Sequence, residues 1–471
     1  MIPKEHIGLY TDHYELVMAQ GFFLNGKKDE EANFDYFFRK IPFQGGYVVF
    51  AGLGDLLKMI QRFRFDSDAC EYLLKLGLNP EFVKYLGGFA FAGDIYAPAE
   101  GELVFPIEPV MRVSGGLIEC QIIETLLLNI INFESLIATK AARIKSAAGD
   151  KVGMEFGLRR AQGLGGIQAS RAAAIGGFET TSNLYAAYHY DLQPTGTQAH
   201  SWIQSFDSEL EAFRCFAKAF PKRCILLLDT YDTLKSGAPN AIKAAKEMEE
   251  RGEKLFGVRL DSGDLAYLSK QVRKELDDAG LHYIKIAVSN QLDEHVVKSL
   301  NDQGAPIDLL GVGTHLATGG NDSSLDGVYK LTMAAGKPRL KISDNIEKIL
   351  LPGVKQTYRL IDENNRFYGD VLTLEDEPAP ETMYHPVQPG IFTDIKGYRA
   401  EPLLRKVMEK GRIIMPEISI KESADYCKRR LSQLPDEHKR FVNPHVYKVG
   451  LSANLLALRD NMIREARSKI R

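Results

Sequence analysis

The sequence predicts an α/β protein whose central part is a succession of strand–helix units, either a (β/α) barrel or a doubly wound sheet. Short apolar runs alternate with amphipathic helical segments from about residue 151 to about 329. The runs carry few polar residues, as parallel strands buried on both faces do. The polar residues that close successive runs are 32, 29 and 24 residues apart, about one strand–helix unit each: Asp229, Asp261, Asn290 and Thr314.

The first part of the chain, residues 1–120, mixes strand-like runs with short helices. The runs are rich in aromatic and β-branched residues, and prolines are typical of their positions at sheet edges. They occupy residues 34–38, 47–50, 94–98 and 101–113. A long helical pattern follows over 121–149 and ends at Gly149.

The strand–helix units occupy the second part, residues 121–330. Six segments read as strands: 151–157, 194–200, 224–230, 254–262, 283–290 and 308–314. The helices between them end at glycines; for example, Leu268, Val272 and Leu276 share one helical face and Gly280 follows at the C′ position. Chemistry in a (β/α) barrel lies where strands end and helices begin, and each polar run falls at such a point.

Beyond residue 330 the strand–helix period is lost. Residues 331–400 are predicted to form short strands and turns, whereas residues 401–471 are predicted to be mainly helical and carry many charged side chains. We expect this C-terminal extension to serve packing or an interface.

The composition excludes several classes of protein. Among 471 residues, 45% are hydrophobic and 26% charged, which is ordinary globular usage and excludes a disordered or collagen-like chain. A net charge of −3 gives no electrostatic reason to expect nucleic acid or an anionic membrane as a partner.

The expected location is the cytoplasm. Five scattered cysteines predict reduced, structural thiols, and the N-terminal residues lack the apolar core of a secretory signal. The most apolar stretch, 122–137, carries two glutamates and two asparagines, which favours a buried helix over a membrane span.

A glycine-rich turn closes the last strand of the series. Gly311, Gly313 and Thr314 offer consecutive backbone N–H groups and a hydroxyl, which together can bind a phosphate. Barrels commonly bind phosphate after their late strands. The alternative interpretation is a plain tight turn.

Charged residues accompany two neighbouring strand ends. Arg259 lies inside an otherwise apolar strand and must be paired or meet an anion. Asp261 follows it, and Asp229 closes the preceding strand, so their carboxylates can hold Mg²⁺–diphosphate or ribose hydroxyls. A structural Arg–Asp pair with helix caps is the alternative.

Further candidates lie at other strand ends. Thr197 and His200 precede the only tryptophan, Trp202, and a histidine there can act as base or nucleophile. Arg159 and Arg171 suit a multiply anionic ligand or a carboxylate held bidentately. A hydrogen-bonded structural histidine and solvated arginines are the alternatives.

Taken together, these segments resemble the nicotinate phosphoribosyltransferase family. The resemblance runs in the family's order from about residue 8 to the C-terminal helices. It rests on TDHYELVMAQGFF (11–23), FFRKIPFQGGYVVFAGL (37–53), EFGLRRAQG (155–163), GGFETTSN (176–183), GTQAHSW (196–202), GVRLDSGDLA (257–266), SNQLDE (289–294), GVGTHLAT (311–318) and GVYKL (327–331).

The resemblance implies a type II phosphoribosyltransferase fold: an irregular, incomplete (β/α) barrel packed with an α/β sandwich domain, plus a helical C-terminal tail. The sandwich would combine residues 1–120 with 331–400. The implied reaction joins nicotinate to phosphoribosyl diphosphate, giving nicotinate mononucleotide and diphosphate in NAD salvage. ATP hydrolysis is coupled to it, with Mg²⁺ as the metal.

The resemblance also assigns roles to residues. His200 becomes the phosphohistidine, and Asp229 and Asp261 hold ribose or Mg²⁺–diphosphate. The 5′-phosphate falls on Gly311 to Thr314. Contacts to the pyridine substrate fall on Tyr14, Thr197 and Arg259, with Arg159 and Arg171 nearby. In the family, Tyr14 and the Arg39–Lys40 pair complete the neighbouring subunit's site, which implies a homodimer with shared active sites.

Two departures from the family pattern stand out. Gln291 occupies a position where many relatives carry an aspartate, so the ribose contact there stays open. Cys427 is the only cysteine of the C-terminal tail, so no zinc site is expected there. A basic set past the barrel is a candidate for ATP or diphosphate, or a solvated turn: Lys341, Lys348, Lys355 and Arg359.

Three alternative functions compete with this one. A nicotinamide-specific relative would read the amide with an acidic residue, whereas the matching stretch 179–183 offers Thr180, Thr181 and Ser182, with Glu179 as its only acid. The decarboxylating quinolinate enzyme has a much shorter chain. A catalytically silent barrel that binds sugar phosphate would not need His200.

Overall fold

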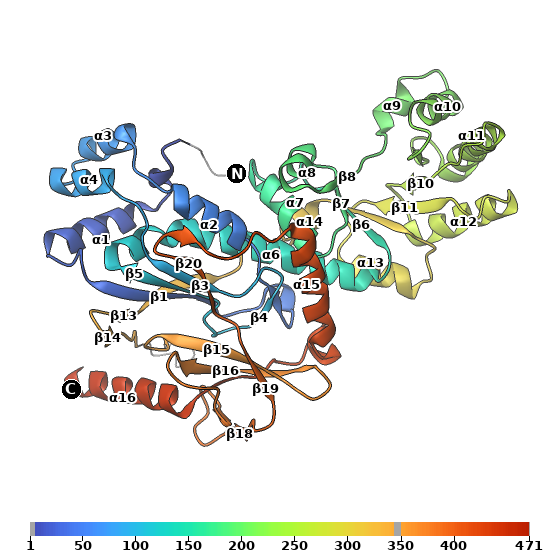
Figure 1. The fold of residues 1–471 in the computed structure, drawn as a ribbon. Coiled ribbons are helices and arrows are strands. Elements are labelled where there is room, and N and C mark those ends of the chain that lie inside the picture. The colour runs from blue at the N-terminus through green and yellow to red at the C-terminus, as the bar shows by residue number, and fades with distance from the viewer. Residues whose placement is uncertain (1–4, 343–349, 471) are drawn as a thin grey trace. The chain divides into compact units, whose positions relative to one another are not determined.

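The computed structural model describes residues 5–342 and 350–470. The chain forms two compact units (Figure 1). Unit 1 contains residues 1–139 and 324–471, and unit 2 contains residues 140–323. The segments that we distinguish from the sequence as 1–120, 331–400 and 401–471 all belong to unit 1.

Unit 1 contains a seven-stranded antiparallel sheet whose strands come from both ends of the chain. In spatial order they are β14 (Lys337–Pro338), β13 (Gly327–Ala334), β1 (Glu31–Phe38), β5 (Met111–Gly116), β3 (Asp94–Ala97), β20 (Arg405–Glu409) and β21 (Arg412–Ile413). The helical elements of this part of the chain are η1 (Ile7–Leu9), α1 (His13–Leu24), η2 (Pro42–Gln44), α2 (Leu53–Arg62), α3 (Ser67–Lys75), α4 (Pro80–Gly87), α5 (Leu117–Ile122) and α6 (Glu124–Ala148). Apolar side chains of the strands and helices, such as Phe34, Leu57 and Ile130, form one large core.

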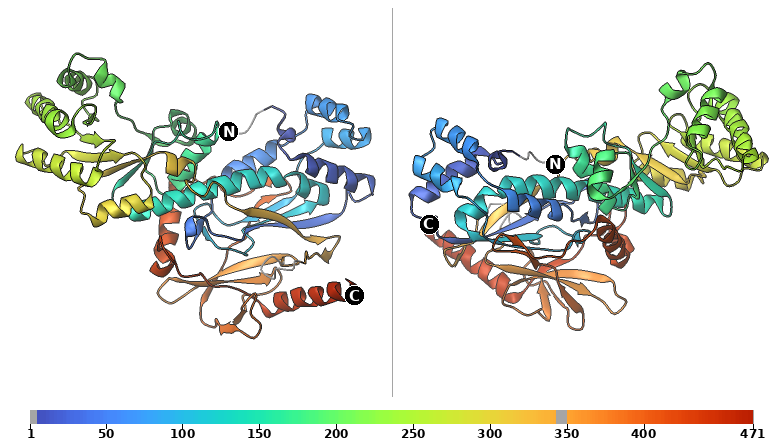
Figure 2. Two further views of the ribbon diagram at one scale, coloured as in Figure 1. Left: turned by 180° about the vertical axis from the view of Figure 1, so that it is seen from behind. Right: turned by 45° about the horizontal axis from the view of Figure 1, so that its top comes forward.

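A second, six-stranded sheet of unit 1 is built from the C-terminal third of the chain. Its order is β18 (Phe392–Asp394), β17 (Thr382–Tyr384), β22 (Val449–Leu451), β16 (Phe367–Leu374), β15 (Lys355–Ile361) and β19 (Arg399–Pro402). The remaining elements are the pair β2 (Val48–Val49) and β4 (Leu103–Val104), and the helices α15 (Ile420–Gln433), η5 (Asp436–His438) and α16 (Ala453–Ile470). Helix α16 lies along this sheet, as the views of Figure 2 show. Residues 401–471 therefore contribute strands to both sheets in addition to two long helices.

Unit 2 is a seven-stranded, all-parallel sheet with helices between its strands. The spatial order is β8 (Gln193–Pro194), β7 (Thr180–Thr181), β6 (Val152–Glu155), β12 (Leu309–Val312), β11 (Lys285–Ser289), β10 (Gly257–Leu260) and β9 (Ile225–Leu227). Its helices are α7 (Gly165–Ile175), α8 (Leu184–Tyr190), α9 (His200–Gln204), α10 (Glu209–Ala219), the π-helical turn η3 (Thr233–Gly237), α11 (Ala238–Glu250), α12 (Leu265–Asp278), α13 (Glu294–Asp302) and α14 (Thr314–Ala317).

The strand order identifies this sheet as an opened barrel. The last strand, β12, pairs with the first, β6, as in a closed (β/α) barrel, but β8 and β9 do not pair among the described strands. Local sequence explains the opening: Pro194 has no backbone N–H for a ladder and Gly196 follows it, so β8 ends after two residues. Of the six predicted strands, five are confirmed; the prediction for 194–200 is wrong beyond Pro194.

The two helices of unit 2 for which the sequence predicts a stop glycine, α12 and α13, end just before Gly280 and Gly304. Helix α12 is capped by Asp264, whose carboxylate accepts the backbone N–H of Tyr267 at 3.0 Å. It buries Val272 and Leu276 and stops before Gly280, whose φ of 75° is left-handed. Within the described residues, no helix is both long enough and apolar enough to cross a bilayer.

Candidate functional site

The carboxyl ends of β9, β10 and β11 are joined by a chain of hydrogen bonds. The Asp229 Oδ2 atom, just after β9, accepts the backbone N–H of Asp261 and the Ser262 hydroxyl, each at 2.7 Å. The Asp261 Oδ1 atom in turn accepts the hydroxyl of Ser289, the last residue of β11. The two carboxylates thus converge at one edge of the sheet, because parallel strands end on the same side.

Asp229 keeps unused hydrogen-bonding capacity. Its Oδ1 atom is buried and has no hydrogen-bond partner among the described residues. A buried carboxylate oxygen without a donor is costly in free energy unless a ligand or an ion completes it.

Arg259 extends from β10 toward the loop that follows β8. It donates to the Thr197 hydroxyl and, at 3.0 Å, to the Gln198 carbonyl oxygen. Its Nε atom is buried without a partner, and within the described chain no carboxylate lies at ion-pair distance from its guanidinium. Burial lowers the pKa of Arg259, and the charges of Asp261 and Asp229 oppose this only in part. The structure thus leaves a half-buried cation with an unpartnered Nε–H and no carboxylate in contact, which is the property of an anion-binding group.

His200 lies at the opening of the barrel. It is the first residue of α9, and its Nδ1 atom is 3.1 Å from the Thr230 hydroxyl oxygen, which follows β9. Helix α9 is anchored by Trp202, whose indole N–H donates to the Ala212 carbonyl oxygen at 3.1 Å and whose ring packs on Phe216. Trp202 therefore fixes the helix against α10, while the His200 ring bonds across the opening.

The glycine-rich turn closes β12. Gly311 lies within that strand, Gly313 follows it, and Thr314 begins the short helix α14. A Cβ atom on Gly311 would approach the Phe156 ring to 2.6 Å, and one on Gly157 would approach the Ala317 Cβ to 2.3 Å. Glycine at these positions allows the ends of β6 and β12 to pack closely beside the turn.

The other predicted site residues belong to further elements of the chain. Arg159 is exposed in the loop after β6, although its charge contributes to the lowered pKa of Arg259. Arg171 is buried on α7 with its guanidinium 5.8 Å from the Tyr190 ring centroid. Tyr14 belongs to unit 1, where it is 47% exposed on α1; burial and the charges of Glu124 and Glu15 raise the pKa of its phenol.

Two residues of the predicted basic set are structural. Lys355 is buried with its Nζ atom 2.9 Å from Asp35, and Arg359 is fully buried between Glu102 and Asp370. The prediction that they meet ATP or diphosphate is therefore wrong. Lys341 is exposed, and Lys348 lies outside the described residues.

Glu179 also has a structural partner. Its carboxylate accepts the Gly153 backbone N–H at 2.7 Å and pairs with Lys145. These contacts lie at the amino ends of β6 and β7, at the edge of the sheet opposite to Asp229 and Asp261. Sequence reasoning missed two other residues, although Thr230 is the last residue of the predicted strand 224–230 and Ser289 lies next to the last residue of the predicted strand 283–290.

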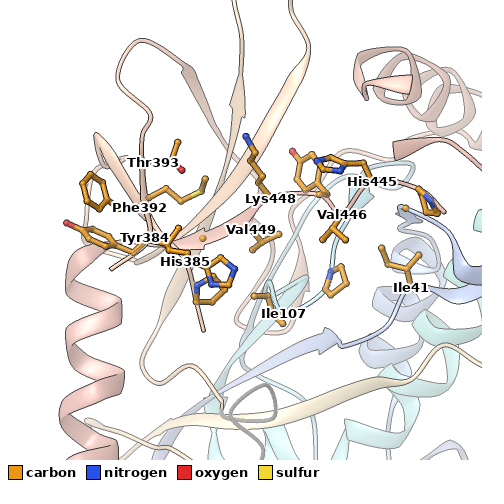
Figure 3. Close-up of a pocket in the computed structure, with 18 of the residues that line it drawn as sticks. Ile41, Ile107, Tyr384, His385, Phe392, Thr393, His445, Val446, Lys448 and Val449 are labelled. Carbon is orange, nitrogen blue, oxygen red and sulfur yellow. The ribbon is translucent and has the colours of Figure 1, made fainter. Parts of the chain in front are cut away.

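Unit 1 contains a separate cavity of about 490 Å³. Its walls are largely apolar, with Ile107, Tyr384 and Phe392 among them, and its polar lining includes His385 and Lys448 (Figure 3). None of the predicted site residues lines it.

The site in unit 2 fits a magnesium ion that is bound together with an oxyanion. No group of three or more His, Cys, Asp and Glu side chains within residues 5–342 and 350–470 is arranged to hold a metal ion by itself. Mg²⁺ usually takes one or two protein carboxylates and completes its coordination with water and ligand phosphates. The unpartnered Oδ1 of Asp229, beside Asp261, fits that donor set.

An opened (β/α) barrel with a sandwich unit built from both ends of the chain is the architecture of the type II phosphoribosyltransferases. Models of nicotinate phosphoribosyltransferase match most of the chain: the N-terminal domain at residues 9–132, the family model at 153–360 and the C-terminal domain at 354–459. The chain belongs to the nicotinate phosphoribosyltransferase family.

Individual relatives agree with this assignment. The chain is 43% identical to nicotinate phosphoribosyltransferase of Bacillus subtilis, over 99% of this chain and 97% of that protein. It is 36% identical to the Caenorhabditis elegans protein of the same name, over 95% and 92%. The crystal structure of human nicotinic acid phosphoribosyltransferase superposes with a TM-score of 0.86, at 32% identity, and the match covers 96% of this chain and 99% of that one.

A more distant structure supports the fold alone. Nicotinate-nucleotide pyrophosphorylase from Pyrococcus furiosus matches with a TM-score of 0.74 at 24% identity, covering 92% of this chain and 97% of that chain. The predicted fold class, an incomplete barrel with a sandwich domain and a helical C-terminal tail, is confirmed.

Proposed function

We propose that this protein condenses nicotinate with phosphoribosyl diphosphate, releasing nicotinate mononucleotide and diphosphate, as a salvage step of NAD biosynthesis. Family membership supports the reaction. The observation that carries the proposal is the connected set of strand-end groups in unit 2: an incompletely neutralised arginine, two converging carboxylates and a histidine at one edge of the sheet.

Arg259 is the proposed contact for the nicotinate carboxylate. Its half-buried guanidinium has an unused Nε–H, so it can form a charge-assisted hydrogen bond with an anion. Thr197 holds the guanidinium in place and lies beside the proposed pyridine position. Arg159 and Arg171 would add positive charge, and Tyr14 would contact the ring from a second copy of the chain.

Phosphoribosyl diphosphate would occupy the ends of β9, β10 and β12. Gly311, Gly313 and Thr314 are the proposed 5′-phosphate site, and Asp229 and Asp261 the site for ribose or the diphosphate-bound metal. Bound Mg²⁺ would neutralise negative charge on the diphosphate.

The reaction itself requires little acid–base chemistry from the chain. The pyridine nitrogen is already a nucleophile, so its lone pair forms the bond to ribose C1 while the C1–oxygen bond to diphosphate breaks. The chain's contribution is orientation of the two substrates and stabilisation of charge in the transition state.

ATP hydrolysis would be coupled to the transfer through a phosphohistidine at His200. A phosphoryl group adds about −1.5 to −2 charges beside the proposed diphosphate position. Such a charge can drive the reaction only if the phosphorylated and free enzyme bind substrate and product differently. His200→Ala should therefore lose ATP hydrolysis and ATP stimulation but keep a slow, ATP-independent transfer. ADP and nicotinate mononucleotide measured together test this; ADP formation that stays stoichiometric with product would contradict the assignment.

Preference for nicotinate over nicotinamide is consistent with the position of Glu179. That carboxylate is paired with Lys145 at the far edge of the sheet and cannot receive an amide N–H near Arg259. Product analysis with each substrate, with and without ATP, tests the proposed function. Nicotinate-dependent diphosphate release is expected, and equal or better turnover with nicotinamide would refute it.

The proposed assembly is a homodimer with shared active sites. Tyr14 is half-exposed on α1, which suits a residue that completes a site in another subunit. Light scattering combined with activity tests this; a fully active monomer would contradict it.

A further inference from the structure

The cavity of unit 1 is large enough for an organic molecule. Its volume of about 490 Å³ falls in the range of small-molecule sites. The β17–β18 hairpin forms one side with Tyr384, Phe392 and Thr393, whereas Ile41 and Val446 lie on the other side (Figure 3). Segments that are distant in sequence thus enclose one space, and none of these residues has a part in the proposed reaction.

Apolar side chains at this cavity are open to solvent. Phe392 is 64% exposed and Ile391 is 49% exposed on the hairpin side, and Val446 on the other side is 82% exposed. Single exposed apolar side chains are common on protein surfaces, but a group of them around a cavity indicates a binding site. The walls therefore suit the apolar body of a ligand.

A histidine supplies a hydrogen-bond donor to this apolar space. The His385 Nδ1 atom accepts the backbone N–H groups of Val387 at 3.1 Å and of Gln388 at 2.9 Å, within the loop of the hairpin. An imidazole that accepts hydrogen bonds at Nδ1 carries its N–H at Nε2. Among the described residues this Nε2–H has no partner, so it can donate to a ligand.

Lys448 adds a positive charge at the cavity. Its Nζ atom lies 4.2 Å from the centroid of the Tyr368 ring, and no carboxylate of the described residues lies within ion-pair distance of it. No aspartate or glutamate occurs among the described residues that line the cavity. An anionic ligand would therefore meet a cation and a donor without meeting a like charge.

The backbone beside the cavity is strained. Ile107, which lines the cavity, has a φ of 69° although its side chain is β-branched. Phe43 and Gln44, which precede the lining residue Gly45, have φ values of 60° and 48°. Left-handed conformations are unfavourable for residues with a Cβ atom, and they cluster at ligand sites. The Ile107 N–H donates to the Phe38 carbonyl oxygen at 2.9 Å, so the fold holds this strained turn in place.

We propose that this cavity binds a small organic monoanion, a carboxylate or sulfonate carried on an apolar body. The body would lie between Phe392 and Val446, and the anion would meet Lys448 and the Nε2–H of His385. A single cation suits a single negative charge, in contrast to the several charges of phosphoribosyl diphosphate. Binding at this cavity requires no group of unit 2, so the inference is independent of the proposed transfer reaction.

Binding of 8-anilinonaphthalene-1-sulfonate to the full-length protein tests this proposal. The probe is an aromatic monoanion that fluoresces in apolar surroundings. We expect one saturable site per chain. Octanoate should displace the probe about 5- to 10-fold more effectively than octanamide, which has the same apolar body without the charge.

Two matched pairs of variants locate the bound probe. Val446→Glu places a negative charge in the cavity wall, whereas Val442→Glu places it on a valine that is 74% exposed and does not line the cavity. The first should weaken binding about 10-fold or more, and the second by less than about 2-fold. Lys448→Met should weaken binding about 2- to 5-fold. Its control, Lys396→Met, changes a lysine that pairs with Glu381 outside the cavity and should leave binding unchanged.

Each other result overturns the proposal. Binding that does not saturate, or that all four variants weaken alike, shows nonspecific adsorption of the probe. Binding that Val446→Glu and Lys448→Met leave unchanged places the probe elsewhere on the protein. Equal displacement by octanamide and octanoate contradicts recognition of an anion, and a wild type that binds no probe shows that the cavity is closed to small molecules in solution.

Discussion

Two arginines, one buried in unit 1 and one half-buried in unit 2, show opposite uses of the same side chain. In unit 1, Arg359 bonds Asp370 at 3.0 and 2.7 Å, pairs with Glu102 and donates to the Leu103 carbonyl oxygen. Burial alone would lower its pKa, but Asp370 and Glu102 raise it well above its ordinary value.

In unit 2, Arg259 has only a hydroxyl and a carbonyl oxygen as partners among the residues that the structure describes, and burial lowers its pKa. A buried charge that is fully paired supports the fold, whereas one with unused donors and a lowered pKa is available to a ligand. Burial of a charge is thus informative about function only after its partners have been counted.

The largest expected effect is on the stability of unit 1. Arg359→Met would leave Glu102 and Asp370 buried without their cation, which should lower the free energy of unfolding by about 3–5 kcal/mol. Urea denaturation measures this change. Arg259→Met is the matched control, and we expect it to change stability by less than about 1 kcal/mol. Equal losses in both variants would show that Arg259 supports the fold as Arg359 does.

The second effect is on substrate binding. Arg259→Ala should remove a charge-assisted contact worth about 2–4 kcal/mol, or about 30- to 1000-fold in the KM for nicotinate. Steady-state kinetics on the folded variant measures this change. An unfolded variant, with no specific rise in KM, would instead favour a structural role for Arg259.

A smaller effect is expected from Ser289→Ala. This change removes the hydroxyl that donates to Asp261, a bond worth about 0.5–1.5 kcal/mol, so the KM for phosphoribosyl diphosphate should rise by about 3- to 10-fold. Ser269→Ala is the control because the buried Ser269 hydroxyl bonds only the Ala266 carbonyl oxygen of its own helix. A similar rise in both variants would indicate a general packing effect.

The smallest effect concerns Glu108, which lies beside Asp370 in the network of Arg359. Burial, followed by the charge of Asp370, raises the pKa of Glu108 well above its ordinary value, so the native state keeps this proton to higher pH than the unfolded chain does. Its stabilising contribution is complete below about pH 4.3, the pKa of an unfolded glutamate, and is lost as the pH rises through the native pKa.

Glu108→Gln mimics the protonated carboxyl. We expect it to match the wild type within about 1 kcal/mol at low pH and to gain relative stability as the pH rises. Denaturation curves of both proteins at several pH values measure this difference. A difference that does not vary with pH would contradict a raised pKa at Glu108.

The sequence predicts the strand–helix units well because their signals are local. Apolar runs, helix caps such as Asp264 and stop glycines such as Gly280 all act within a few residues. The convergence of Asp229 and Asp261 also follows from topology alone, since parallel strands end at one edge.

The errors arise where partners are distant in sequence. The sequence predicts that Lys355 and Arg359 are free to bind an anion, because their partners Asp35 and Glu102 precede them by hundreds of residues. Glu179 is neutralised by Lys145, 34 positions away on another element. Thr230 was overlooked because its neighbour Asp229 carries the charge, whereas its hydroxyl gains a contact only when the opening of the barrel brings His200 beside it.

The opening of the barrel has a consequence for solubility. Among the described strands, β8 and β9 each have one unpaired edge, and such edges are potential templates for pairing with another chain. Both are very short, with two and three residues, and β8 ends in Pro194, which cannot donate to a ladder. An incoming strand would therefore find few aligned donors and acceptors, which disfavours edge-to-edge pairing at the opening of the barrel.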